Sequence, residues 1–347
     1  SDEMVGRDSA AFREFLQDAL DLIEFANGAV DTPWGAVRAE MGHPEPFGLS
    51  MVGVGNEQWQ TERADFFERY EMFEKAIHEY APYIRLIGSA GPNVGSGQYR
   101  MAWDFYHAHE DQPDFAYAVD EHYYVPPAWL YEHVDFYDEY SRKVKVFSGE
   151  YAAHPASGFN NPKANTLDGA LAEAAFLTGV ERNADVVVLA SYAPLFARAG
   201  YAQWSPDLIW FDGAGCYGSP SYYVQKMYAC NMGDAVLDTC GAEREAWREG
   251  IYYCASLSRE RDEIIVKIVN SKEEARSVDL ALPERWRDSN RIQAQILTGE
   301  SRDSCNSLGE PEKIAPVEKE AASLKGIELP PLSFTVLRIG AMSGIRN

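Results

Sequence analysis

Basic side chains are scarce in this sequence. Among its 347 residues, 31 Lys and Arg stand against 54 Asp and Glu, which gives a formal net charge of −23 at pH 7. Nucleic acids and anionic membrane surfaces are bound by clusters of Lys and Arg, so this balance argues against both as partners. A neutral ligand is compatible with it.

Paired cysteines and long apolar runs are also lacking. The five cysteines are odd in number and show no C-x-x-C spacing, which predicts neither a disulfide framework nor a cysteine metal site. No apolar stretch approaches the length of a membrane span, and Ser1-Asp2-Glu3 does not begin a signal peptide. The first residue is not Met, so we expect the sequence to be an internal piece of a longer protein.

The first part of the chain alternates between apolar runs and segments with helical periodicity. The apolar runs predict strands at residues 49–54, 84–87, 115–124, 144–147 and 186–190. The periodic segments predict helices at residues 9–27, 61–80, 99–109, 128–140, 165–181 and 221–230. This alternation is typical of parallel βα units.

The helical period ends after about residue 233. Short strand-like runs separated by polar turns follow at residues 251–256, 263–269, 275–282, 292–298 and 333–339. They predict an all-β module, most simply a sandwich, in which the charged stretch 310–323 is a solvated loop. We therefore expect an α/β domain over residues 1–233 and a β-sandwich domain over residues 234–347.

Two of the predicted parallel strands end in a glutamate. Gly55-Asn56-Glu57 follows the first run, and Gly149-Glu150-Tyr151 follows the fourth. The carboxyl ends of parallel strands are where α/β proteins place their chemistry. Two carboxylates there suit cleavage of a glycosidic bond, one to protonate the leaving oxygen and one to act as nucleophile or base. A single glutamate at a strand end is more often a solvated or ion-paired residue, so neither motif is specific alone.

Several segments in the same order resemble the α-L-arabinofuranosidases of glycoside hydrolase family 51. They are RAEMGHPEPF (residues 38–47), GNEQW (55–59), DEHYY (120–124), SGEYA (148–152), residues 170–177 and SYAPLF (191–196). The likeness extends to the last predicted strand, so it covers nearly all of the chain. Matching segments in the right order and spacing are far more specific than the Asn-Glu pair alone.

The resemblance implies roles for particular residues. Glu57 would be the general acid/base and Glu150 the nucleophile, ~5 Å apart as a retaining mechanism requires. Glu150 would form a covalent arabinosyl-enzyme, while Glu57 would donate and then recover a proton. Asn56 would hold the sugar 2-hydroxyl, Tyr124 would hydrogen-bond the nucleophile and His122 would orient the site. No metal or organic cofactor is expected, because carboxylates and water suffice.

The resemblance also implies a fold and leaves alternatives open. In the family the acid/base ends the fourth strand of a (β/α)8 TIM barrel, so we expect a partial barrel of strands 4–8 with a C-terminal β-sandwich. The parent protein would release terminal arabinofuranose from an arabinose-containing polysaccharide or oligosaccharide such as arabinan or arabinoxylan. One alternative is a truncated chain that is inactive alone and only associates or binds carbohydrate, with self-association or a missing N-terminal segment covering the open sheet. Another is a different retaining enzyme, such as a β-xylosidase or endoglucanase.

Weaker signals come from three other motifs. His107 and His109 have the spacing of metal ligands on a strand, but on a helix they point apart, so we expect surface positions. His154 follows the nucleophile segment without a specified role. Trp204-Ser205-Pro206-Asp207 lies in the long loop after the fifth predicted strand, and Asp207 is a candidate for a sugar hydroxyl contact.

Overall fold

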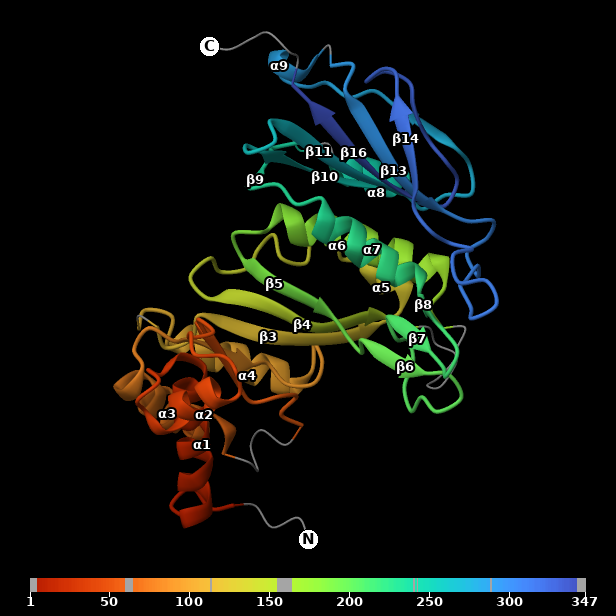
Figure 1. Cartoon of the computed structure of the whole chain (residues 1–347). Helices are drawn as coiled ribbons and strands as arrows, with labels where there is room; N and C mark the ends of the chain where they lie inside the picture. The colour runs from red at the N-terminus through yellow and green to blue at the C-terminus, as the bar shows by residue number, and fades with distance from the viewer. Residues whose placement is uncertain are drawn as a thin grey trace. The chain divides into compact units, whose positions relative to one another are not determined.

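A computed structural model describes residues 5–59, 65–112, 114–154, 164–239, 241, 243–287 and 289–341. The chain divides into two compact units (Figure 1). The first comprises Ser1–Tyr123, Ser141–Gly149 and Val188–Ala190, and the second comprises Tyr124–Tyr140, Glu150–Val187 and Ser191–Asn347. Among the described residues, no helix combines the length and apolar character needed to cross a bilayer.

The five apolar runs of the first part form strands. They are β1 (Met51–Val54), β2 (Arg85–Ser89), β3 (Ala118–Val125), β4 (Lys145–Ala153) and β5 (Val187–Tyr192), arranged in one sheet in the order β1-β2-β3-β4-β5. β1 pairs with β2 in parallel, and β2 pairs with β3 in parallel. The predicted parallel sheet is therefore confirmed at these strands. β3 and β4 each pass from the first unit into the second.

Helices alternate with these strands. They are α1 (Ala10–Asn27), α2 (Pro33–Glu40), α3 (Phe66–Tyr80), α4 (Gly97–Ala108), α5 (Pro127–Glu132), α6 (Leu167–Arg182) and α7 (Pro220–Cys230). Several begin at a hydroxyl cap: the Ser9 side chain accepts the N–H of Phe12 at 3.1 Å, and Ser96 and Ser219 act in the same way on α4 and α7. The sequence predicted no element for α2, whose start is marked by Thr32 and Pro33.

Two predicted elements of the first part of the chain differ clearly in length from the observed ones. The predicted helix 128–140 ends at Glu132, and the residues after it form turns in which Phe136 and Tyr137 pack against Phe176 of α6. The strand predicted to end at residue 147 continues to Ala153, so Glu150 lies within β4 rather than at its tip. The extension is stabilised from outside the strand, because Glu173 of α6 accepts the Ala153 N–H at 2.9 Å.

Residues that the sequence assigned to the long loop after β5 form a small sheet. Its three short strands are β6 (Phe196–Arg198), β7 (Ile209–Phe211) and β8 (Cys216–Gly218), in the order β6-β7-β8. Trp210 of β7 is buried, and its indole N–H donates to Asn165 at 3.1 Å. The sheet thus anchors the loop that carries Trp204 and Asp207.

The C-terminal part forms sheets, as predicted. In chain order its elements are β9 (Ala235–Val236), α8 (Glu243–Arg248), β10 (Ile251–Ser258), β11 (Glu263–Asn270), β12 (Arg276–Val278), α9 (Glu284–Arg287), β13 (Ile292–Thr298), β14 (Val317–Ala321), β15 (Ile327–Leu329) and β16 (Ser333–Gly340). One sheet has the order β14-β13-β16-β11-β10-β9, and the other pairs β12 with β15. β14 falls in the stretch predicted to be a loop, which is a correction. Its charged residues mark an exposed edge strand.

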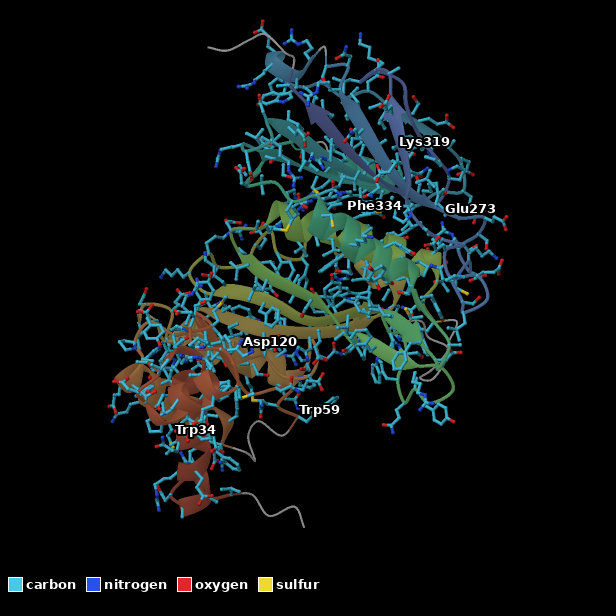
Figure 2. The ribbon with its side chains drawn as sticks, in the orientation of Figure 1. Trp34, Trp59, Asp120, Glu273, Lys319 and Phe334 are labelled. Atoms are coloured by element: carbon cyan, nitrogen blue, oxygen red, sulfur yellow. The ribbon has the colours of Figure 1, made fainter. Side chains whose placement is uncertain are left out.

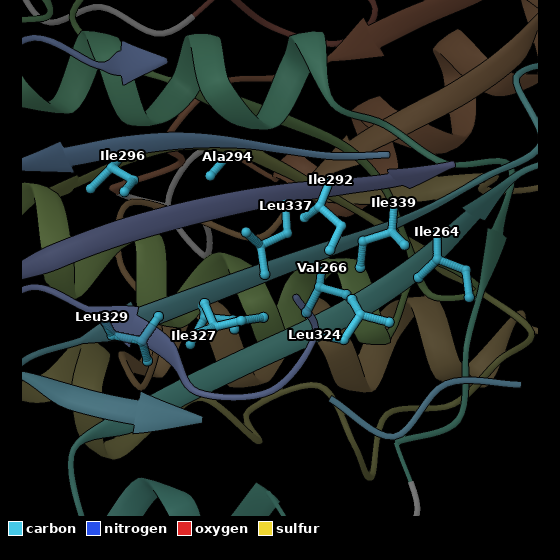
Figure 3. Close-up of a cluster of buried hydrophobic side chains, with 11 residues drawn as sticks. Ile264, Val266, Ile292, Ala294, Ile296, Leu324, Ile327, Leu329, Leu337 and Ile339 are labelled. Atoms are coloured by element: carbon cyan, nitrogen blue, oxygen red, sulfur yellow. The ribbon is translucent and has the colours of Figure 1, made fainter. Parts of the chain in front are cut away.

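Both faces of the six-stranded sheet are covered within the second unit. On one face, side chains of β11, β13 and β16 pack with Leu324, Ile327 and Leu329 (Figure 3). On the other face lie α6 and α7 (Figure 1), where the Tyr228 ring stacks on Phe334 with centroids 5.2 Å apart. α6 is buried nearly along its whole length, which explains its Ala-rich sequence.

Candidate active site

Glu57 lies just beyond β1 in a tight loop of the first unit. Gly55 has φ 93°, and a Cβ at this position would lie 2.6 Å from the Phe66 ring, so only glycine fits without rearrangement. Glu57 itself has φ 45°, a left-handed conformation that costs a non-glycine residue about 1–3 kcal/mol. Backbone strain of this kind is concentrated at functional sites. The loop therefore holds the Glu57 side chain in a specified direction.

Both oxygens of the Glu57 carboxylate have partners. Oε1 lies 3.0 Å from Nδ1 of His122, and Oε2 accepts the indole N–H of Trp59 at 3.2 Å. The Glu57 side chain is 24% exposed, whereas His122 is 2% exposed. The carboxylate thus keeps access to solvent while its orientation is fixed from the protein side. We call Glu57, Trp59, Asp120 and His122 the Glu57 cluster.

Asp120 completes this cluster, and the sequence analysis gave it no role. Its Oδ2 lies 3.1 Å from Nε2 of His122, so the imidazole connects two carboxylates. Figure 2 labels Asp120 on β3 and Trp59 beyond β1. The signal in the sequence was the Asp-x-His spacing within a strand, which places both side chains on one face.

Side chains on the opposite face of β3 make structural contacts. Glu121 accepts the Trp103 indole N–H at 2.8 Å, and the Tyr123 hydroxyl lies 2.5 Å from the Ser148 hydroxyl. Both Glu121 and Tyr123 are fully buried. Adjacent residues of β3 therefore serve different purposes, as the alternation of a strand predicts.

Glu150 is held by a neighbour in the second unit. The Tyr124 hydroxyl donates to Oε2 of Glu150 at 2.8 Å. Trp204 packs against the edge of Tyr124, with ring centroids 5.2 Å apart and an interplanar angle of 65°, and its ring also lies 5.6 Å from His154. We call Glu150, Tyr124, His154 and Trp204 the Glu150 cluster. The weak sequence signals at His154 and Trp204 thus belong to one group of contacts.

Asp207 is placed differently from Trp204. Its side chain is buried, and its Oδ2 has no hydrogen-bond partner among the described residues. Burial raises the pKa of Asp207 to about 7. The backbone N–H of Asp207 donates to Asn165 at 3.0 Å. Asp207 is thus held through its backbone, and a contact of its side chain with a sugar hydroxyl stays a prediction.

Glu173 is a second buried carboxyl that the sequence analysis missed. It lies on α6, and its Oε1 accepts the Ala153 N–H at the end of β4. Burial raises the pKa of Glu173 to about 7, although hydrogen bonds from Ala153 and Ser221 act in the opposite direction. A lone Glu within the apolar run Leu171-Ala172-Glu173-Ala174-Ala175 was the available signal.

The remaining candidates are dispersed. Asn56 is exposed, and its carbonyl accepts the Gln58 side-chain amide at 3.1 Å. His107 packs against Trp103, while His109 stacks on Phe115 with centroids 4.2 Å apart. The two histidines therefore have separate neighbours.

The cysteines that the structure describes are free thiols. They are Cys216, Cys230, Cys254 and Cys305, and Cys240 lies outside the described residues. Burial raises the pKa of the Cys254 thiol, so this side chain behaves as an apolar core group.

Comparison with known proteins places the chain in a family. A model of the α-L-arabinofuranosidase 1 domain matches residues 2–142, and a model of the α-L-arabinofuranosidase C-terminal domain matches residues 149–333. An extracellular exo-α-L-arabinofuranosidase of Streptomyces chartreusis is 44% identical over 231 residues, which cover 66% of this chain and 26% of that protein. α-L-Arabinofuranosidase 1 of Arabidopsis thaliana is 32% identical over 337 residues, covering 94% of this chain and 46% of the relative.

Solved structures of α-L-arabinofuranosidases superpose on the chain. The arabinose-bound MgGH51 α-L-arabinofuranosidase superposes with a TM-score of 0.80 at 28% identity, covering 96% of this chain and 52% of that one. An α-L-arabinofuranosidase from Thermotoga maritima shares the fold, with a TM-score of 0.74 at 17% identity. The chain spans no more than about half the length of these first relatives (26%, 46% and 52%). It belongs to the α-L-arabinofuranosidases of glycoside hydrolase family 51.

Proposed function

We propose that the protein containing this chain is a retaining α-L-arabinofuranosidase that releases terminal arabinofuranose from arabinan or arabinoxylan. Family membership supports the reaction class. The observation that carries the proposal is that one face of β3 presents a partner for each of two glutamates. His122 contacts Glu57, and Tyr124 contacts Glu150.

The proposed mechanism assigns Glu150 as nucleophile and Glu57 as general acid/base. Glu150 attacks C1 and forms a covalent arabinosyl-enzyme, while the proton of Glu57 passes to the leaving oxygen. Water then attacks C1, gives its proton to Glu57 and releases arabinose. This double displacement requires the two carboxyls to lie ~5 Å apart. Alternate residues of a strand are separated by ~7 Å, a spacing that suits partners for two such groups.

Three side chains support the two carboxyls in this proposal. Tyr124 donates its hydroxyl to the Glu150 carboxylate and keeps it directed at C1. His122 orients Glu57, and Asn56, next to Glu57 in the chain, binds the sugar 2-hydroxyl. A hydrogen bond to the 2-hydroxyl that strengthens in the oxocarbenium-like transition state contributes to catalysis in retaining enzymes.

For the fold, we propose that β1 to β5 correspond to strands 4–8 of a (β/α)8 barrel. Glu57 follows the first strand and Glu150 lies in the fourth, which is the same interval as between strands four and seven of the family's barrel. The proposed domains are the partial barrel over residues 1–233 and a β-sandwich over residues 234–347. The order of the two C-terminal sheets, six strands and two, is consistent with a sandwich.

We also propose that the outer edges of the parallel sheet are covered in the working protein, by self-association or by another segment. Among the described residues, β1 pairs only with β2 and β5 only with β4. Unpaired strand edges recruit further strands. Light scattering and an aryl-arabinofuranoside assay of the purified chain test this: particles larger than a monomer or an inactive chain are expected, and a stable monomer with family-like turnover contradicts it.

The substrate proposal is tested by assaying the protein on aryl α-L-arabinofuranoside, β-xyloside and β-glucoside. We expect turnover of the arabinofuranoside alone, with arabinose released in the retained configuration, as followed by NMR. Preferred hydrolysis of the β-xyloside or β-glucoside would instead assign the site to another class of retaining glycosidase. Loss of all three activities in the chain, with activity in the longer parent protein, would show that this chain is incompetent alone.

A further inference from the structure

The contacts of Asp120 are unusual for a residue with a purely structural role. Its Oδ2 meets Nε2 of His122 at 3.1 Å, while its Oδ1 is buried with no hydrogen-bond partner among the described residues. Nearly all buried polar atoms in folded proteins are paired, so an unpaired oxygen calls for an explanation. A function of the other oxygen, Oδ2, would explain why a carboxyl is buried at this position.

The position of Asp120 is fixed by its neighbours. A Cβ on Gly149 would lie 1.9 Å from Oδ1, so the backbone of the SGE segment is packed directly against this oxygen. Tyr106 of α4 interacts with Asp120, and burial raises the pKa of Tyr106 well above its usual value, with the Tyr70 and Asp120 charges adding to this effect. Tyr106 is therefore neutral, and the Gly149 backbone packed against Oδ1 restricts rotation of the Asp120 side chain.

A neutral imidazole has one N–H donor and one nitrogen that accepts, and which nitrogen carries the proton is set by its partners. His122 has a carboxyl on each side, Asp120 at Nε2 and Glu57 at Nδ1. In the proposed reaction Glu57 alternates between acid and carboxylate, whereas Asp120 takes no part in bond making. Of these two carboxyls, Asp120 is the one that can accept a hydrogen bond from the ring in every step.

We infer that Asp120 is a positioning residue that holds the His122 ring proton on Nε2, so that Nδ1 faces Glu57 as an acceptor for its acidic proton. The inference deepens the proposed function and rests on it for its catalytic consequence. With the acid form of Glu57, the O–H donates to Nδ1 and Nε2–H donates to Asp120. After Glu57 has protonated the leaving alcohol, the His122 ring does not gain a proton, because the water of the second step reprotonates Glu57.

The tautomer can be measured without any turnover. In the chain with 15N-labelled histidine, NMR correlations between ring carbons and nitrogens report which nitrogen carries the proton, and His122→Gln identifies the His122 signals among the seven histidines. At a pH where the ring is neutral, we expect the proton on Nε2. Of the two carboxylates that contact the ring, Glu57 remains in Asp120→Asn, so the proton should move to Nδ1. A ring proton on Nδ1 in the unaltered chain, or no change in Asp120→Asn, overturns the inference.

Glu121→Gln is the matched control, because Glu121 is the next residue of β3 and points to Trp103 on the opposite face. It should leave the His122 tautomer unchanged. A change as large as that in Asp120→Asn would mean that any perturbation of β3 moves the proton, and would count against a specific role for Asp120.

The catalytic consequence is measured in the active parent protein. In Asp120→Asn, kcat/KM for arabino-oligosaccharides should fall about 10- to 100-fold, a part of the ~10²–10⁴-fold that general acid catalysis contributes. For aryl arabinofuranosides with good leaving groups, which need little protonation, the loss should be below about threefold. An equal loss on both substrates indicates a structural role and overturns the inference. Absence of arabinofuranosidase activity in the unaltered parent overturns the proposed function instead, and the tautomer measurement is unaffected.

Discussion

Tyr124 donates a 2.8 Å hydrogen bond to Glu150, whereas its neighbour Tyr123 contacts Ser148 on the other face of β3. One strand therefore separates a residue that serves a candidate nucleophile from one that serves the core. The same alternation puts His122 beside Glu57 and Glu121 beside Trp103.

This arrangement predicts different outcomes for two similar substitutions. Tyr124→Phe removes the hydrogen bond to Glu150 and should lower kcat about 10-fold or more, since one hydrogen bond to a charged group contributes about 1.5–3 kcal/mol. Tyr123→Phe should leave kcat nearly unchanged and lower the free energy of unfolding. Steady-state kinetics and urea unfolding of both variants measure this. A larger catalytic loss in Tyr123→Phe would contradict the assigned roles.

Replacing the proposed nucleophile should abolish turnover in the parent protein. Glu150→Ala leaves nothing to form the covalent arabinosyl-enzyme, so activity should fall almost completely on every arabinofuranoside, whatever its leaving group. Mass spectrometry of the unaltered protein with a slow substrate should show the adduct on the peptide that contains Glu150. Glu79→Ala, at an exposed position of α3, is a suitable control and should retain full activity. An adduct on another peptide would exclude Glu150.

Glu57→Ala should have a substrate-dependent effect. Loss of the general acid should slow natural substrates by about 10²–10⁴-fold, while aryl substrates with good leaving groups form the covalent intermediate nearly as fast as before. Added azide should then replace water in the second step and yield α-arabinofuranosyl azide, with retained configuration, which NMR identifies. Equal loss on both substrate types without an azide product would rule out Glu57 as acid/base.

The buried carboxyl of Glu173 predicts a pH-dependent stability. Its pKa is raised from 4.5 to about 7 by burial, so between these values the folded state binds a proton that the unfolded state has lost. The contribution is complete below pH 4.5 and disappears as the pH rises through 7, a change of up to about 3 kcal/mol. Glu173→Gln keeps an acceptor for the Ala153 N–H and cannot ionise.

Urea unfolding at pH 5 and pH 8 tests this sign. The difference in free energy of unfolding between the two pH values should be smaller in Glu173→Gln than in the unaltered chain. At pH 8 the variant should be the more stable of the two. Asp207, whose pKa burial also raises to about 7, should contribute in the same direction and leave a residual slope. A variant that is less stable at pH 8 than the unaltered chain would contradict the prediction.

The sequence predicted the positions of the parallel strands because each is an apolar run bounded by polar residues. It failed where contacts from elsewhere decide the structure. β4 continues beyond Gly149-Glu150, a pair that looks like a strand end, since Glu173 supplies an acceptor for Ala153. β14 pairs along an edge despite its charged side chains, because backbone hydrogen bonds to β13 do not depend on hydrophobicity.

The candidate site, too, was predicted from the sequence only in part. Glu57 and Glu150 were proposed from motifs at predicted strand ends, and His122 and Tyr124 from the resemblance to the family. Asp120 lies in the same motif, but an aspartate two residues from a histidine gains meaning only once its Oδ2 is seen at Nε2. The strain at Glu57 was also invisible, because a left-handed φ at a glutamate has no sequence signature.

The alternation of side chains along β3 limits which insertions and deletions the chain can tolerate during evolution. Substitutions in the strand alter one face at a time, but the insertion or deletion of a single residue upstream of Asp120 exchanges the two faces. Such an event would turn Glu121 and Tyr123 toward the carboxylates and bury Asp120 and His122 in their place. Length variation among related chains should therefore accumulate in the loops on either side of β3, while the strand itself keeps a constant number of residues.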